Sequence, residues 1–136
     1  MTQFVNLLGL DIGERRIGVA RVNLIAKLPE ALATLPNNTT FLERLKQLIG
    51  EYQIDGLVVG LPRNLNGQET AQSQTIRDFC AKYLNRLNLP IIWQDETLSS
   101  VAAESQAKDK QSKAGVDALA ARIILEDYLK TSEEKK

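Results

Sequence analysis

Two apolar runs joined by a short turn, at residues 7–20, constrain the fold of this chain more than any other stretch. The first run, Leu7 to Leu10, has the length and composition of a strand that is covered on both faces. Gly13 lies in the turn, where glycine permits backbone angles that other residues disfavour. The stretch predicts a β-hairpin with Asp11 where the first strand leaves the core. A carboxylate at the end of a central strand is costly unless a cation, a metal or a hydrogen-bond donor meets it. The alternative is that Asp11 only forms the turn and accepts hydrogen bonds from its own backbone.

Apolar periodicity predicts alternating strands and helices after the hairpin. Strands are expected at 31–35, 56–61 and 90–96, and amphipathic helices at 41–52, 76–87 and 115–130, with a short helix around 101–103. Thr40 and Glu43 have the spacing of a capping box before the first helix. Residues 107–114 are predicted as a mobile loop and 131–136 as a disordered tail. This order predicts one α/β domain over residues 1–130, with a mixed five-stranded sheet and helices on both faces.

The composition, 43% hydrophobic and 25% charged over 136 residues, is typical of a soluble globular domain. No run approaches the roughly 18 apolar residues that span a bilayer, and no signal-peptide pattern is seen, so a cytoplasmic protein without a membrane partner is expected. Cys80 is the only cysteine, which excludes an intrachain disulfide and a multi-cysteine zinc site. Its place in an apolar helical stripe predicts a buried thiol.

The sequence contains no histidine, which excludes Ser-His-Asp, Cys-His and histidine-zinc chemistry. It also lacks the P-loop and Gly-x-Ser-x-Gly patterns. Any hydrolysis must therefore use carboxylates, lysine or a metal. The 17 basic and 17 acidic residues give a net charge of zero, so nucleic-acid binding would depend on local patches.

Three acidic side chains far apart in sequence, Asp11, Glu96 and Asp117, can meet at one end of the predicted sheet. Asp11 and Glu96 each end a strand, and ligands of open α/β sheets gather at the carboxyl ends of strands. Asp117 begins the last helix, where complementing the helix dipole is its alternative role. Because a slip of one residue reverses the faces of a strand, Asp95 is the alternative to Glu96. Converging carboxylates favour Mg²⁺ or Mn²⁺, which assist phosphoryl displacement.

Four segments carry a further pattern: Leu-Gly-Leu-Asp-Ile-Gly-Glu-Arg-Arg-Ile-Gly-Val-Ala at 8–20, Val-Val-Gly-Leu-Pro at 58–62 with Gly67, Asp-Glu-Thr-Leu-Ser-Ser at 95–100, and Val-Asp-Ala-Leu-Ala-Ala at 116–121. Together they resemble the YqgF/RuvX family of pre-16S ribosomal RNA nucleases, which is similar to Holliday-junction resolvases of the ribonuclease H-like fold. The resemblance covers nearly the whole chain and implies that fold. It also implies metal-dependent phosphodiester cleavage in precursor 16S rRNA in the bacterial cytoplasm, with catalytic metal ligands at Asp11, Glu96 and Asp117. Precursor rRNA and ribosome-assembly intermediates are the partners it implies.

One position departs from the family pattern, because Thr97 stands where the family commonly has arginine after the Asp-Glu pair. Phosphate contacts are therefore expected from other cations near the acidic end of the sheet. These are Arg15, Arg16, Arg63, Lys108, Lys110 and Lys113. For the lysines, a solvated loop is the alternative explanation.

Three other functions stay open at this point. DNA junctions are alternative substrates for the same chemistry. The segment Asp11-Ile12-Gly13 also resembles the phosphate-binding element of actin-like ATPases and sugar kinases, although those proteins close two such domains around a nucleotide. The third alternative is a ribonuclease H-like domain that binds RNA or a ribosome-assembly partner without cleavage.

Overall fold

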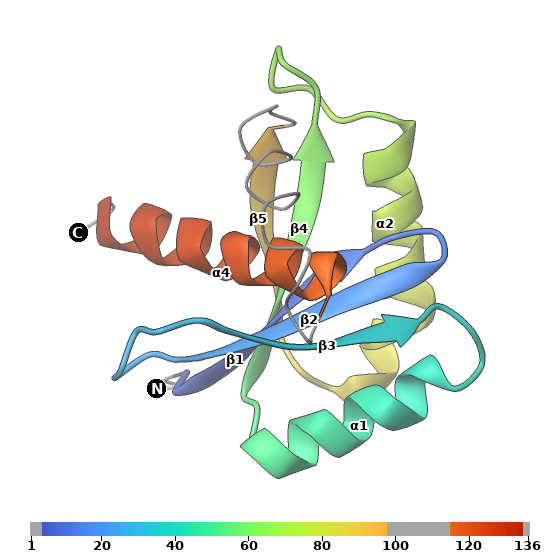
Figure 1. The fold of residues 1–136 in the computed structure, drawn as a ribbon. Coiled ribbons are helices and arrows are strands. Elements are labelled where there is room, and N and C mark those ends of the chain that lie inside the picture. The colour runs from blue at the N-terminus through green and yellow to red at the C-terminus, as the bar shows by residue number, and fades with distance from the viewer. Residues whose placement is uncertain (1–3, 98–114, 135–136) are drawn as a thin grey trace.

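The computed structural model describes residues 4–97 and 115–134 (Figure 1). Its strands are β1 (Asn6–Ile12), β2 (Arg16–Asn23), β3 (Glu30–Pro36), β4 (Gly56–Arg63) and β5 (Ile91–Thr97). Its helices are α1 (Phe41–Tyr52), α2 (Ala71–Lys82), the short 3-10 helix η1 (Leu84–Leu87) and α4 (Val116–Glu134).

The five strands form one mixed sheet with the order β3-β2-β1-β4-β5. The pairs β1–β2 and β2–β3 are antiparallel, whereas β1–β4 and β4–β5 are parallel. This confirms the predicted hairpin and the predicted mixed sheet. Because β1, β4 and β5 run in the same direction, their carboxyl ends lie at the same end of the sheet.

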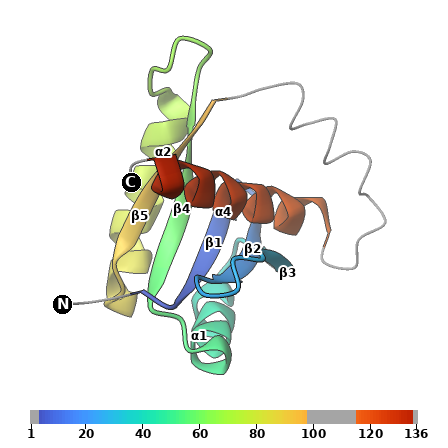
Figure 2. The ribbon, with the colours of Figure 1, turned by 90° about the vertical axis from the view of Figure 1, so that its left-hand side faces the viewer.

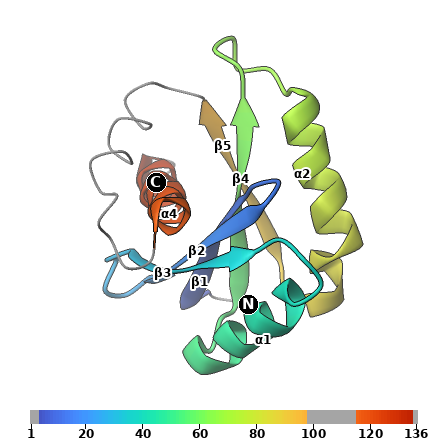
Figure 3. The same cartoon turned by 45° about the vertical axis from the view of Figure 1, so that its right-hand side comes forward.

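Helices cover both faces of the sheet, as predicted: α1 and α2 pack on one face and α4 on the other (Figure 3). Residues along β1 alternate between these faces. Leu8 and Leu10 belong to the core beneath α1 and α2, whereas Leu7 packs against α4. The same alternation places Asp11 on the α4 face.

Helix α4 crosses the sheet from β2 towards β5 (Figure 2) and approaches its backbone closely. A Cβ atom on Gly18 would lie 1.8 Å from the backbone oxygen of Asp117, and one on Gly60 would lie 2.4 Å from Cδ1 of Ile124. Gly18 is also the cross-strand partner of Asp11. The missing side chain at Gly18 therefore allows the first turn of α4 to sit beside Asp11.

Gly18→Ala is expected to destabilise the protein by about 3 kcal/mol or more, because the added methyl group meets backbone rather than a flexible side chain. Gly50→Ala is the matched control. A Cβ atom at Gly50, on the exposed side of α1, meets nothing within 4 Å, so this change should raise stability by about 0.5–1 kcal/mol. Urea unfolding measures both. Equal stability of the Gly18→Ala variant and the wild type would contradict this packing.

Two helix boundaries differ from the prediction. The predicted helix 76–87 divides into α2, which ends at Lys82, and η1, which is followed by Asn88 in a left-handed conformation. Helix α4 continues to Glu134, four residues into the predicted disordered tail. Thr131 and Ser132 line a hollow with residues of β5, so packing against the sheet edge accompanies this extension.

The capping box predicted at Thr40 and Glu43 is wrong. Helix α1 has no side-chain cap, because the hydroxyl of Thr40 donates instead to Oδ1 of Asn38 at 2.6 Å. A capping box is found at the start of α2, where Thr70 and Ser73 satisfy each other's backbone N–H groups.

Cys80 is buried in the α2 core, as predicted, and burial raises the pKa of its thiol to about 12. The predicted short helix around 101–103 and the predicted loop at 107–114 lie outside the described residues. None of the helices in residues 4–97 and 115–134 combines the length and the hydrophobicity that a membrane span requires.

Candidate active site

Asp11 lies near the carboxyl end of β1, on the face that α4 covers. Burial raises the pKa of its carboxyl group to about 6, and the negative charge of Asp117 contributes to this rise. The proximity of Asp117 follows from the contact between Gly18 and the first turn of α4. A largely buried carboxylate therefore lies where the sequence predicted one.

Glu96 lies near the end of β5, on the same face as Asp11. Its Cγ atom is 3.7 Å from the position that a Cβ on Gly60 would occupy beneath α4. Burial raises the pKa of Glu96 well above its usual range, and a side-chain hydrogen bond with Asp127 of α4 raises it further. The charges of Asp127, Asp11 and Asp95 act in the same direction.

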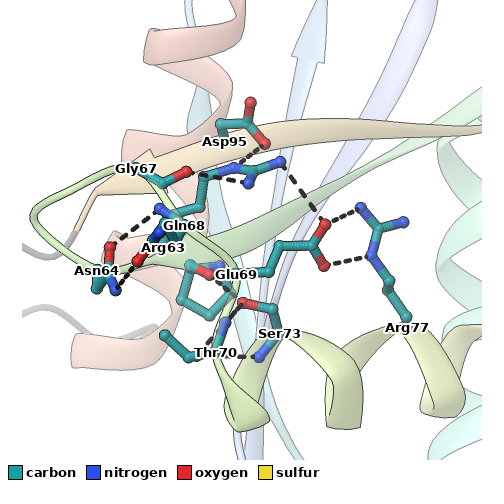
Figure 4. A network of polar contacts seen from close by, with 10 residues as sticks. Arg63, Asn64, Gly67, Gln68, Glu69, Thr70, Ser73, Arg77 and Asp95 are labelled. Carbon is teal, nitrogen blue, oxygen red and sulfur yellow. Dashed lines mark hydrogen bonds and ion pairs between the residues drawn. The ribbon is translucent and has the colours of Figure 1, made fainter.

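Asp95 lies on the opposite face of β5, among the residues drawn in Figure 4. Its Oδ1 atom is 2.9 Å from Nε of Arg63, an ion pair without hydrogen-bond alignment, and its side chain is 62% exposed. Of the two neighbouring acids, Glu96 is therefore the one that shares the α4 face with Asp11.

Asp117 lies in the first turn of α4, as predicted. Nε of Arg16 donates a hydrogen bond to Oδ2 of Asp117 at 2.9 Å. Among residues 4–97 and 115–134, no three acidic side chains converge closely enough to form a metal-ligand group. Electrostatic contacts thus link Asp11 to both Asp117 and Glu96, but the three carboxylates do not meet at one point.

Sequence reasoning missed Asp127, the hydrogen-bond partner of Glu96. Asp127 follows Asp117 by ten residues, close to three helical turns, so both acids lie towards one side of α4. That spacing was a visible signal. Its meaning depends on the direction in which α4 crosses the sheet, which no local pattern shows.

The predicted phosphate contacts differ in their surroundings. Arg15 is exposed in the β1–β2 turn, whose backbone is fixed by hydrogen bonds from Asn37 to Gly13 and Arg15, each at 2.9 Å. Arg16 is engaged by Asp117. Lys108, Lys110 and Lys113 lie outside the described residues.

Arg63 belongs to a polar network on the face opposite Asp11 (Figure 4). Its Nη1 atom donates to the backbone oxygen of Gly67 at 3.1 Å, and its guanidinium group lies near the carboxylates of Asp95 and Glu69. Glu69 accepts two hydrogen bonds from Arg77, at 2.7 and 3.0 Å. Arg63 thus links the end of β4 to the loop that follows it. Phosphate binding by Arg63 stays a prediction.

The donor set fits a divalent cation. Asp11 and Glu96 present hard oxygen ligands on one face, and no described Lys or Arg side chain forms an ion pair with either. Instead, the contact between Glu96 and Asp127 brings two acidic groups together, which requires a shared proton or a cation. Oxygen ligands of this kind suit Mg²⁺ or Mn²⁺.

In the absence of metal, the contribution of Asp11 to stability is expected to fall as pH rises between about 4 and about 6. The folded protein favours the protonated carboxyl of Asp11, whose pKa is raised from 3.8 to about 6, whereas the unfolded chain ionises at lower pH. This difference corresponds to up to about 3 kcal/mol. Urea unfolding in EDTA at pH 4 and pH 7 measures it, and Asp11→Asn should flatten the profile. An unchanged profile in that variant would contradict the assignment.

The fold is that of the ribonuclease H-like Holliday-junction resolvases. It superposes on Thermus thermophilus RuvC in complex with a Holliday junction substrate with a TM-score of 0.55 and 12% sequence identity, over 94% of this chain and 96% of that one. The fowlpox virus Holliday junction resolvase gives a TM-score of 0.51 and 14% identity, over 96% and 99% of the two chains. These likenesses confirm the predicted fold class.

The chain belongs to the RuvX family, whose family model, described as Holliday junction resolvase, matches residues 5–131. A relative from Thermoanaerobacter pseudethanolicus is 35% identical over 96% of this chain and 100% of its own length. Another from Roseiflexus is 39% identical over 90% of this chain and 92% of its own length. Both are named pre-16S rRNA nucleases, and nucleases are hydrolases that act on phosphodiester bonds. The resemblance seen in the four sequence segments is confirmed.

Proposed function

We propose that this protein is a metal-dependent endonuclease that hydrolyses phosphodiester bonds in precursor 16S rRNA, in the cytoplasm. The observation that carries the proposal is the placement of Asp11 and Glu96. Both come from strands that end at the same end of the sheet, both are largely buried beneath α4, and both have raised pKa values. Membership of the RuvX family and the names of the relatives support the same reaction class and substrate.

Asp11 and Glu96 would hold Mg²⁺ or Mn²⁺. Asp117 would be a further ligand, and because the described acids do not converge into a three-ligand group, its carboxylate would have to shift towards Asp11 when the metal binds. When bound, the ion would supply Lewis-acid activation of the scissile phosphodiester. The chain provides the frame: the pairing of Asp11 with Gly18 fixes one ligand against the sheet. The hydrogen bond from Arg16 orients Asp117.

Cations near the site would position the nucleic-acid backbone. Arg15 is exposed in the turn that follows Asp11, and Arg16 is 65% exposed although it pairs with Asp117. Both can therefore reach a phosphate group. Arg63, Lys110 and Lys113 complete the proposed set of contacts.

The test is cleavage of an end-labelled precursor 16S rRNA fragment by the purified protein in Mg²⁺, in Mn²⁺ and in EDTA. We expect defined products with either metal and none in EDTA. Intact RNA under all three conditions would contradict the proposal, and so would equal cleavage in EDTA.

A DNA junction is the second candidate substrate, because the family model is described as Holliday junction resolvase. A four-way DNA junction incubated under the same conditions separates the two. Faster cleavage of the junction than of the rRNA fragment would favour DNA resolution over rRNA processing.

A further inference from the structure

The loop between β4 and α2 emerges between the two strands that carry the central acids. Strand β4 lies between β1 and β5, and Pro62 of β4 is the register partner of Glu96. The loop extends beyond the end of the sheet at which β4 and β5 terminate (Figures 1 and 3). A nucleic-acid strand that is bound at Asp11 and Glu96 and continues beyond the end of the sheet would therefore meet this loop.

The loop presents a leucine at its apex. Leu65 is 82% exposed, and burying such a side chain is favourable. A single exposed apolar residue is ordinary on a protein surface. Leu65 differs because the turn that displays it is tightly hydrogen-bonded and lies at the proposed active end.

Backbone and side-chain hydrogen bonds fix this turn (Figure 4). The N–H of Gly67 donates to the oxygen of Asn64, and the N–H of Asn64 donates to the oxygen of Gln68, both at 2.9 Å. Oδ1 of Asn64 accepts from the N–H groups of Asn66 and Gln68, both at 3.0 Å. Asn at the first position and Gly at the fourth are typical of such turns. These hydrogen bonds restrain the backbone of the apex.

The chemistry of the apex favours bases over phosphates. Residues 64–68 carry no charge. A phosphate group would find no charged side chain within these five residues. Apolar side chains such as leucine can insert between bases, and unpaired bases expose faces that such a side chain can cover.

We infer that Leu65 packs against an unpaired base of the RNA substrate beside the bond that is cut, an inference that rests on the proposed function. In this role Leu65 is a positioning residue. It would hold single-stranded or unstacked RNA over the carboxylates and would make no contact with the reacting phosphate itself.

Leu28 provides a matched control, because it is 77% exposed but lies in the β2–β3 loop. That loop follows Asn23, which pairs with Asn6 at the start of β1, so Leu28 lies at the end of the sheet opposite the acids. A general effect of removing an exposed leucine would appear in both variants.

The experiment measures RNA binding by fluorescence of 2-aminopurine placed in the single-stranded part of an rRNA fragment. All variants carry Asp11→Asn so that the RNA stays intact. We expect Leu65→Ala to weaken the Kd roughly tenfold, equivalent to about 1.4 kcal/mol, and to abolish the fluorescence change. Leu65→Phe should retain both, and Leu28→Ala should match the parent. Thermal unfolding should show equal stability of all four proteins.

Unchanged affinity and fluorescence in Leu65→Ala would overturn the inference. An apex that binds a protein instead of RNA would give this result. Equal losses in Leu65→Ala and Leu28→Ala would overturn it as well. Cleavage by the protein with Asp11 intact is scored separately. Cleavage without any dependence of binding on Leu65 would leave the proposed function standing and this inference wrong. Binding that depends on Leu65, without any cleavage, would support this inference and contradict the proposed function.

Discussion

Asp11→Asn is expected to lower the rate of precursor rRNA cleavage by roughly a thousand-fold. Asparagine preserves the size of the side chain but removes the charge, and losing about 4 kcal/mol of metal-assisted stabilisation corresponds to that factor. The measurement is single-turnover cleavage of the labelled fragment in saturating Mg²⁺. Cleavage within a few-fold of the wild type would remove Asp11 from the site and would contradict the catalytic assignment.

Stability separates loss of chemistry from loss of fold in this variant. Because burial raises the pKa of Asp11 to about 6, a neutral residue there should make the metal-free protein more stable at pH 7. We therefore expect a protein that is inactive and at the same time harder to unfold in urea. An inactive variant that is also unstable would not support a role for Asp11 in catalysis.

Glu96→Gln is expected to lower the cleavage rate far more than Asp95→Asn, although the two residues are neighbours. Glu96 shares the α4 face with Asp11, so its loss should lower the cleavage rate by at least roughly a hundred-fold, or about 2.7 kcal/mol. Asp95 is 62% exposed and pairs with Arg63 on the other face. Its ion pair is worth about 1 kcal/mol or less, so Asp95→Asn should stay within a few-fold of the wild type.

The same single-turnover assay compares the two variants, with urea unfolding as the check on folding. Equal losses of activity would mean that the whole end of β5 matters rather than one of its faces. A greater loss in Asp95→Asn would place the metal site on the side of α2 and contradict the arrangement proposed here.

Local patterns were sufficient to predict the hairpin and the position of Asp11 near the end of its first strand. Its strand is apolar, its turn contains glycine, and the acid stands where the apolar run ends, all within residues 7–20. The choice between Asp95 and Glu96 could not be made in this way. Ile91, Ile92 and Trp93 are apolar at consecutive positions, so β5 has no alternation that marks its faces. Pairing with β4 beneath α4 supplies that information.

Long-range packing explains what the sequence did not reveal. Asp127 meets Glu96 because α4 crosses towards β5, and that direction depends on close contacts at Gly18 and Gly60. Arg63 was predicted from its position in a loop near the acids. In the folded chain, the carboxylates of Asp95 and Glu69 lie near its guanidinium group. Glu69 follows the turn in sequence and comes back to Arg63 only in the folded protein. Such partners become neighbours only through the tertiary structure.

The most direct test of this account is a crystal soaked in Mn²⁺ and examined by anomalous scattering. The account predicts a manganese peak between Asp11 and Glu96 beneath α4, and no such peak in Asp11→Asn crystals. Manganese bound only on the opposite face beside Asp95, or absent from the pair at saturating concentration, would contradict it.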